Sequence, residues 1–239
     1  MMRAYGDKSG FECTVFGSEC DGGFAQYVRI HGDEAYAIDC DLTDVELAAV
    51  PCAFSTAEGL LHRAGVGPER VLITGASGGV GSAAVQLAKR RGAEVVAICS
   101  QSKAETVLGL GADSVIDRGA DLVDALGENS IDVVLDLVAG DQWSALLDVL
   151  RLGGRYAVAG AIAGPMVNFD VRTLYLKDLS FFGCTFQEDV VFKNIIKYLE
   201  DGEIKPLIAK TFPLHDIGAA QEAFLAKQFV GKLVLIPPQ

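Results

Sequence analysis

A repeated pattern of short apolar segments runs through the middle of the sequence, and most of these segments follow an amphipathic stretch that ends in glycine. The segments are continuously apolar, which is typical of parallel strands covered on both faces. Glycine just after a helix adopts the left-handed conformation at little cost, so each amphipathic stretch indicates a helix that ends before the next strand. The six segments are 71–73, 95–98, 114–116, 133–135, 156–159 and 179–182. The pattern predicts an α/β fold with a doubly wound, six-stranded parallel sheet over residues 51–186.

The two flanks differ from this middle region. Residues 22–30 alternate roughly between apolar and polar side chains, which is typical of a half-buried strand. The other flank predicts a helix over 190–201, a strand near 210–213, a helix over 217–226 and a strand over 232–236. Neither flank is long enough to form a stable domain alone. We therefore expect residues 1–50 and 187–239 to form one β-rich domain together.

A glycine-rich loop follows the first apolar strand. Residues 75–81 read Gly-Ala-Ser-Gly-Gly-Val-Gly and lead into a helical stretch over 82–90. Glycine lets the backbone turn sharply and lets its N–H groups approach a pyrophosphate with no Cβ in the way, and the helix that follows presents the positive end of its dipole. No Gly-Lys-Ser/Thr follows, so the loop is not a Walker loop. The order of strand, loop and helix predicts a dinucleotide-binding Rossmann domain.

The end of the second strand indicates which dinucleotide is bound. In NAD sites an acidic residue about 20 positions further on accepts hydrogen bonds from the ribose, and residues 98–103 contain no acid. Ser100 and Ser102 can donate to a 2′-phosphate, and Lys103 supplies a positive charge for it. Arg118, after the third strand, supports the same choice. The alternative is that Lys103 and Arg118 are ordinary solvated charges, but with the acid missing they favour NADP(H).

The composition excludes several other classes of protein. The 239 residues include 20 Lys and Arg against 32 Asp and Glu, a net charge of −12, and 50% are hydrophobic. The hydrophobic fraction excludes disorder, and the acidic balance argues against nucleic acid, whose binding needs clustered cations. No apolar run is long enough to span a membrane, and residues 1–8 lack the apolar core of a signal peptide. Six cysteines without a C-x-x-C pair fit free thiols in a reducing compartment, so we expect a cytoplasmic protein.

Together these segments resemble the medium-chain dehydrogenase/reductase family, which contains zinc alcohol dehydrogenases and zinc-free quinone reductases. The resemblance covers nearly the whole chain and is carried by residues 21–27, 51–57, 75–81, 110–113, 136–140 and 231–235. It implies a Rossmann domain within a split GroES-like catalytic domain whose N-terminal part is lacking here, and homodimers joined through the last Rossmann strand near 181–185. Short-chain dehydrogenases, the main competitor for the glycine loop, need a Tyr-x-x-x-Lys pair, and none of the six tyrosines has a lysine four residues on.

The resemblance also implies roles for individual residues. Thr56 would contact the nicotinamide, and the pyrophosphate would be held by Gly78, Gly79, Val80 and Gly81. The adenosine phosphate would be surrounded by Ser100, Lys103 and Arg118. The nicotinamide half would be lined, at the carboxyl ends of the strands, by Val138, Gly160 and Ala161. For Val138, plain strand packing is an equal alternative.

Cys52 raises the question of zinc. In the zinc alcohol dehydrogenases that its segment resembles, the cysteine here is a catalytic zinc ligand, and catalytic zinc needs three protein ligands. The family's other two ligands lie upstream of where this chain begins, and the three histidines, His31, His62 and His215, are isolated in the sequence. We therefore expect zinc only in a full-length form. The alternative is that Cys52 is a buried thiol at the domain seam.

Two functions of different classes follow. The first is an NADP(H)-dependent oxidoreductase, or its cofactor-binding portion, that transfers hydride between nicotinamide and a small carbonyl, alcohol or enone. The second is a truncated, non-catalytic nucleotide-binding protein with a sensing or interaction role. If the chain binds NADPH and turns it over, the first function is supported. If it binds NADPH without turnover, the second is supported.

Overall fold

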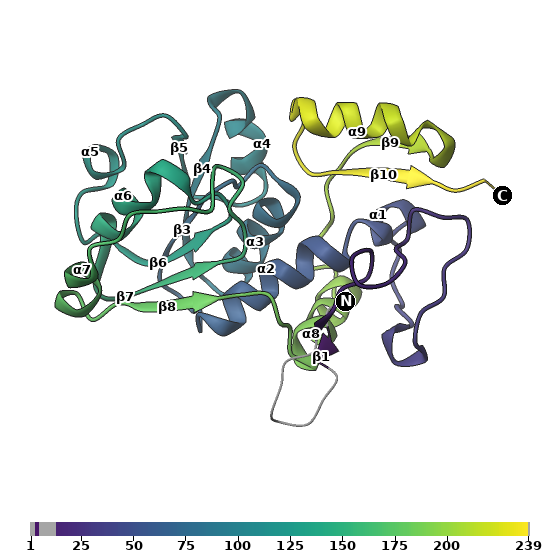
Figure 1. Cartoon of the computed structure of the whole chain (residues 1–239), viewed down its shortest axis with the longest axis horizontal. Coiled ribbons are helices and arrows are strands. Elements are labelled where there is room, and N and C mark those ends of the chain that lie inside the picture. The colour runs from purple at the N-terminus through teal and green to yellow at the C-terminus, as the bar shows by residue number, and fades with distance from the viewer. Residues whose placement is uncertain (1–2, 5–12, 239) are drawn as a thin grey trace.

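The computed structural model describes residues 3–4 and 13–238. Its centre is a six-stranded sheet in the order β5-β4-β3-β6-β7-β8, with parallel pairing throughout (Figure 1). The strands are β3 (Arg70–Ile73), β4 (Glu94–Cys99), β5 (Ser114–Asp117), β6 (Ile131–Asp136), β7 (Leu150–Val158) and β8 (Ser180–Gly183). The chain winds from β3 to one edge and then returns past β3 to the other. The predicted doubly wound sheet is therefore confirmed.

Both faces of the sheet are buried, which explains why its strands are apolar without interruption. On β3, Val71 and Ile73 belong to one core and Leu72 to another. Successive side chains of a strand point to opposite faces, so a strand covered on both must be apolar at every position. The first core includes residues of α2 (Pro51–Arg63), α3 (Gly79–Arg90), α4 (Ala104–Gly109) and α8 (Asp189–Glu200). The second includes residues of α5 (Leu122–Leu126) and α6 (Trp143–Val149), and Leu174 of α7 (Val171–Leu176) packs against it.

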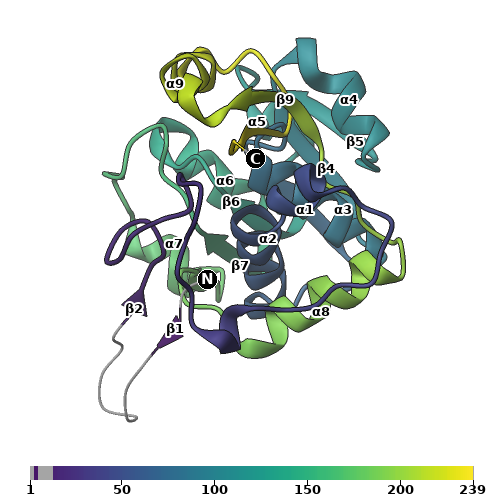
Figure 2. The ribbon, with the colours of Figure 1, turned by 90° about the vertical axis from the view of Figure 1, so that its right-hand side faces the viewer.

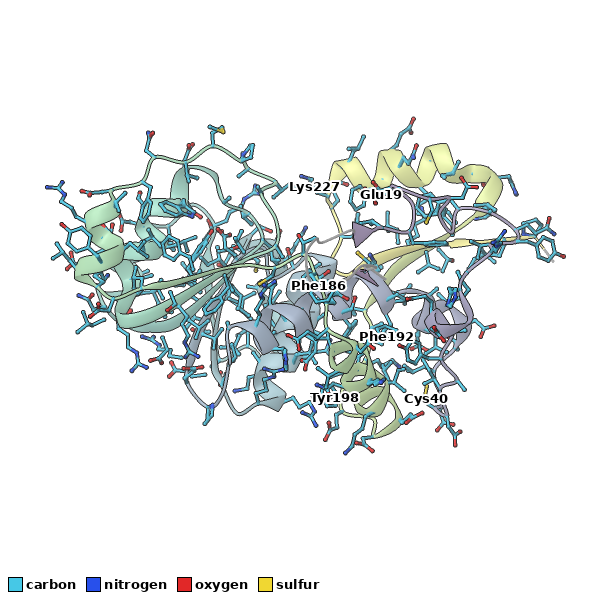
Figure 3. All side chains as sticks on the ribbon, turned by 60° about the horizontal axis from the view of Figure 1, so that its bottom comes forward. Glu19, Cys40, Phe186, Phe192, Tyr198 and Lys227 are labelled. Carbon is cyan, nitrogen blue, oxygen red and sulfur yellow. The ribbon has the colours of Figure 1, made fainter. Side chains whose placement is uncertain are left out.

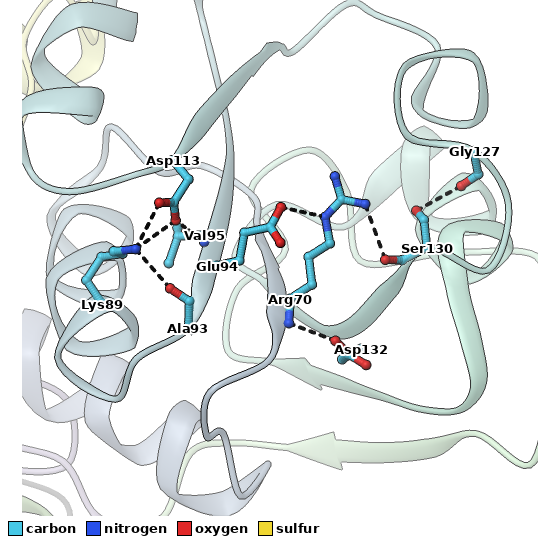
Figure 4. Close-up of polar contacts among 9 residues, drawn as sticks. All are labelled: Arg70, Lys89, Ala93, Glu94, Val95, Asp113, Gly127, Ser130 and Asp132. Carbon is cyan, nitrogen blue, oxygen red and sulfur yellow. Dashed lines mark hydrogen bonds and ion pairs between the residues drawn. The ribbon is translucent and has the colours of Figure 1, made fainter.

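Ion pairs and hydrogen bonds tie the amino ends of the strands together (Figure 4). Arg70, the first residue of β3, pairs with Glu94, the first residue of β4, at 3.0 Å, and its backbone N donates to Asp132 of β6 at 2.7 Å. Asp113, just before β5, accepts from Lys89 at 2.8 Å and from the backbone N of Val95 at 2.7 Å. The Lys89 hydrogen bond, more than any other contact, lowers the pKa of Asp113. These contacts join the amino ends of the strands. The candidate site lies at the carboxyl ends, on the opposite edge of the sheet.

The flanks form a smaller unit beside the sheet (Figure 1). Its elements are β1 (Arg3–Ala4), β2 (Cys13–Thr14), α1 (Asp44–Ala48), β9 (Ile208–Pro213), α9 (Ile217–Ala226) and β10 (Lys232–Ile236). The helix and strands predicted after residue 201 are confirmed, and β9 and β10 pair in parallel. The strand predicted over 22–30 is wrong, because among residues 3–4 and 13–238 no strand pairs with that segment, and its Tyr27 is 86% exposed.

Contacts with α8 and the residues after it hold the N-terminal flank in place. Tyr36 packs on Phe192 of α8 with ring centroids 5.1 Å apart, and Figures 2 and 3 show α8 beside the N-terminal segment. Glu46 of α1 caps its own helix through Thr43 and pairs with Lys205 at 3.0 Å. The backbone N–H of Thr43 is the main cause that lowers the pKa of Glu46 to about 2. Within the described ranges, no helix is long and apolar enough to cross a membrane.

Candidate dinucleotide site

The glycine loop joins β3 to α3 at the middle of the sheet. Gly75 has a φ of +60°, and a Cβ on Gly81 would lie 2.2 Å from the carbonyl oxygen of Gly75, so no larger residue fits at position 81. Gly78 is the N-cap of α3, which places Gly79, Val80 and Gly81 in its first turn. The N–H groups of a first turn have no partner within their helix. The loop therefore offers a tight turn followed by free donors at a positive helix end, which suits a pyrophosphate.

Lys232, which the sequence interpretation left without a role, reaches this loop from the C-terminal strand β10. A Cβ on Gly79 would lie 2.5 Å from Cδ of Lys232, so the lysine side chain passes directly over the first turn of α3. The strand is anchored beside it, because the backbone N of Gly231 donates to the carbonyl oxygen of Ser77 at 3.2 Å. Gly231 has a φ of +91°, and a Cβ there would lie 2.3 Å from the oxygen of Leu207. The sequence feature that could have indicated this contact is the pair Gly231-Lys232, in which a glycine allows the turn that places the lysine at the loop.

The residues predicted to surround the adenosine phosphate lie at the carboxyl ends of β4 and β5. Ser100 and Lys103 follow β4, Arg118 follows β5, and the backbone N of Arg118 donates to the oxygen of Cys99 at 3.0 Å. Nζ of Lys103 donates to the carbonyl oxygen of Lys227 at 2.7 Å. Burial lowers the pKa of Lys103, and the charge of Arg118 lowers it further. The structure thus brings the two predicted cations together.

One acid does lie close to these cations. Asp117 closes β5, and its carboxylate accepts from the backbone N of Gly119 at 2.9 Å and from that of Gln101 at 3.0 Å. These bonds, the one from Gly119 first, lower the pKa of Asp117. Both oxygens are therefore engaged in shaping the loops that carry Lys103 and Arg118.

The residues predicted to line the nicotinamide half follow the carboxyl ends of β6 and β7. A Cβ on Gly75 would lie 3.1 Å from Cγ2 of Val138, and a Cβ on Gly160 would lie 2.6 Å from the oxygen of Leu137. The backbone N of Ala163 donates to the oxygen of Val138 at 2.9 Å. The predicted residues Val138, Gly160 and Ala161 therefore belong to two segments in direct contact, beside the glycine loop.

The start of α2 also lies against the glycine loop. A Cβ on Gly79 would be 3.7 Å from Cβ of Ala53, and Thr56 follows one turn later with a half-buried side chain. Cys52 is exposed on this turn, so the alternative in which it is a buried thiol at the domain seam is wrong. Pro51 and Cys52 are the first two residues of the helix, where side chains are not enclosed by a preceding turn.

The donor set does not fit a metal within the part of the chain that the structure describes. No group of three or more His, Cys, Asp or Glu residues there is arranged to hold an ion. His31 and His215 lie 3.3 and 3.6 Å from the neighbouring acids Asp33 and Asp216, whereas His62 lies 3.8 Å from Glu188. Cys52 is not brought to them, so the described residues do not form a zinc site.

The parallel strand order, the glycine loop after the central strand β3 and the unit built by both flanks define a Rossmann protein of the medium-chain dehydrogenase/reductase class. Comparison with family models agrees. The zinc-binding dehydrogenase family matches residues 79–201, and the chain belongs to that family.

Individual relatives are oxidoreductases by name. An acryloyl-coenzyme A reductase of Metallosphaera sedula is 30% identical over 92% of this chain and 67% of its own length. A Sinorhizobium meliloti structure, provisionally described as an alcohol dehydrogenase, is 43% identical with a TM-score of 0.92, over 97% of this chain and 66% of its own. The 2-octenoyl-CoA carboxylase reductase CinF, solved with NADP and 2-octenoyl-CoA, is 26% identical with a TM-score of 0.86, over 95% and 57%. The chain thus spans about two thirds of the length of such relatives.

Proposed function

We propose that this chain is an NADP(H)-dependent oxidoreductase, or the cofactor-binding portion of one, that transfers hydride between nicotinamide and a small carbonyl, alcohol or enone. The observation that carries the proposal is the placement of cations in a chain with a net charge of −12. Lys232 lies over the start of α3, and Lys103 and Arg118 gather after β4 and β5. Cations at these two places match the two phosphate-bearing parts of NADPH.

Each part of the cofactor has residues suited to it. The N–H groups of the first turn of α3 and the charge of Lys232 suit the pyrophosphate. The 2′-phosphate is assigned to Ser100, Lys103 and Arg118, and the nicotinamide to Thr56, Val138, Gly160 and Ala161. When bound, the nicotinamide supplies the hydride chemistry, and the role of these residues is to bind and orient it. The NADP-bound reductase CinF supports the choice of cofactor by similarity.

The last strand of the sheet suits a homodimer contact. β8 is an edge strand, so one side of its backbone has no neighbour within the sheet. Apolar side chains on and before it are exposed, namely Ile162, Met166, Val171, Tyr175, Leu176 and Phe181. Pairing of two β8 edges would cover both the backbone edge and this apolar surface. Sedimentation of the purified chain tests it, with a dimer expected.

Fluorescence titration with NADPH and NADH tests the proposed function. NADPH should bind more tightly than NADH, because only NADPH carries the phosphate that Lys103 and Arg118 suit. Turnover is then tested over a panel of aldehydes, ketones and enones. Binding without turnover would favour a non-catalytic nucleotide-binding role. If neither NADPH nor NADH bound, both functions would be contradicted.

A further inference from the structure

Asp136, the last residue of β6, is fully buried at the carboxyl end of the sheet. Its carboxylate accepts hydrogen bonds from Oγ1 of Thr74 at 2.6 Å, the phenol of Tyr156 at 2.5 Å, and the backbone N of Val138 at 2.9 Å and of Ala139 at 3.1 Å. Thr74 follows β3 and Tyr156 lies on β7, so one carboxylate joins three neighbouring strands where they end.

Every partner of this carboxylate is a donor. The hydroxyl of Thr74 donates to Asp136, and its oxygen accepts from the backbone N of Leu137 at 2.8 Å. Burial raises the pKa of Tyr156, and the charge of Asp136 raises it further, so the phenol keeps its proton. A side chain in this position must offer acceptor oxygens to donors on several sides, and an amide in its place would bring its own N–H donors against them.

The bonds from Val138 and Ala139 hold a strained backbone. Ala139 has φ 54° and ψ −144°, a conformation that favours glycine and is costly for alanine. The next residue, Gly140, also has a positive φ of 73° and lies against Ala163, where a Cβ would come within 2.8 Å. The turn over 137–140 therefore keeps its shape because its backbone is tied to Asp136 on one side and to the 160–163 segment on the other.

We propose that Asp136 is a positioning residue for the nicotinamide half of the cofactor. With Thr74 and Tyr156 it fixes the strained turn that places Val138 against the 160–163 segment. The proposal rests on the proposed function, since it assigns this turn to the nicotinamide. It goes further in naming the buried group that sets the turn's shape, and it predicts that the loss of Asp136 damages one half of the cofactor site only.

The test compares NADPH with 2′,5′-ADP, which has the adenosine and its 2′-phosphate but lacks the nicotinamide, by calorimetric titration. Asp136→Asn should weaken NADPH at least tenfold and change 2′,5′-ADP less than twofold. Asp113→Asn is the matched control, because Asp113 also accepts a backbone N–H in the same sheet, but at the amino ends of the strands (Figure 4). It should leave the ratio of the two affinities unchanged.

Milder variants keep the test decisive if Asp136→Asn does not fold. Tyr156→Phe removes one donor and keeps the ring, which packs on Trp143 at 5.9 Å and on Phe181 at 5.4 Å between centroids. Thr74→Val removes a second donor, and Thr74→Ser restores the hydroxyl. We expect Tyr156→Phe and Thr74→Val to lower the ratio about threefold or more, and Thr74→Ser to recover it.

Two results would overturn the proposal. The first is an equal loss of NADPH and 2′,5′-ADP binding in folded Asp136 or Thr74 variants, which would make the network a general support of the sheet. The second is a wild-type chain that binds NADPH no more tightly than 2′,5′-ADP, which would remove the nicotinamide contribution while the adenosine half stands. Binding of neither ligand by the wild-type chain would instead contradict the proposed function itself, and with it this inference.

Discussion

The two ends of the candidate cofactor site are built in different ways. The adenosine end consists of side chains on loops, where Lys103 is half-buried and Arg118 is exposed. The proposed nicotinamide end consists of backbone segments, and the fully buried Asp136 accepts hydrogen bonds from the backbone of one of them. Charge at a surface selects a ligand by long-range attraction, whereas a buried network fixes shape. Substitutions at the two ends should therefore alter different properties of binding, and the glycine loop between them should affect both.

Gly81→Val should have the largest effect. A Cβ at this position would lie 2.2 Å from the oxygen of Gly75 and 2.6 Å from Cα of Ala76, so the loop must rearrange. We expect more than a hundredfold loss of affinity for NADPH and NADH alike, and a loss of about 3 kcal/mol in the free energy of unfolding, measured by calorimetric titration and urea denaturation.

Gly109→Ala is the matched control for Gly81. Gly109 lies at the end of α4, where a Cβ would meet nothing within 4 Å. The substitution should leave binding unchanged and raise stability by up to about 1 kcal/mol, because alanine favours the helix. A Gly81→Val protein that binds NADPH normally would show that the loop is not the pyrophosphate site.

Lys103→Glu tests whether the adenosine end alone determines the preference for NADPH over NADH. Reversal of this charge beside Arg118 should weaken NADPH about 30-fold or more, and NADH by no more than about threefold, since only NADPH carries the 2′-phosphate. Fluorescence titration with both cofactors measures the effect. Lys193→Glu, on α8, changes the net charge equally and serves as the control. An equal loss for both cofactors would mean that Lys103 does not recognise the phosphate.

Lys232→Ala addresses the middle of the site. Because its side chain lies over the first turn of α3, its loss should weaken NADPH and NADH by the same factor, about tenfold. Lys210→Ala is the control from the adjacent strand β9, where Nζ lies 4.6 Å from the ring of Phe212. A selective loss of NADPH would place Lys232 at the 2′-phosphate instead.

The pH dependence of cofactor preference tests Lys103 without a mutation. Its pKa is lowered by burial first and by Arg118 second. As pH rises through this lowered pKa, Lys103 loses its charge earlier than an ordinary lysine, and the preference for NADPH should fall with it. Lys103→Arg should keep the preference to higher pH, because arginine stays protonated. Titrations of both cofactors from pH 7 to pH 10 measure the shift.

The sequence led to predicted residues at both ends of the site, and it could predict that Lys103 and Arg118 lie close together, but not the hydrogen-bond network around Asp136. Lys103 and Arg118 each follow an apolar strand within a few residues, and the carboxyl ends of parallel strands meet, so their proximity follows from the order of the strands. Thr74 and Asp136 are 62 positions apart. Neither the burial of Asp136 nor its hydrogen-bond partners can be recognised in the sequence, because both depend on how the strands are arranged.

The same distinction explains the errors elsewhere. The strands of the sheet could be predicted because burial on both faces makes every position apolar. Residues 22–30 have the alternation of a strand, but a strand also needs a neighbour to take its backbone hydrogen bonds, and alternation does not supply one. Lys232 was missed because its contact with Gly79 depends on how the C-terminal strand β10 folds back onto the glycine loop, which lies far from it in the sequence.

Salt should give the smallest and most selective effect. An increase from 0.05 to 0.5 M sodium chloride shortens the screening length from more than about 10 Å to about 4 Å, which weakens attraction between exposed charges. The preference for NADPH over NADH should therefore fall a few-fold, because it depends on Lys103 and Arg118 at the surface. The ratio of the NADPH and 2′,5′-ADP affinities should stay constant, because Asp136 is buried and both ligands carry the 2′-phosphate. If that ratio fell with salt as steeply as the cofactor preference, the two ends of the site would not differ in the way that their burial implies.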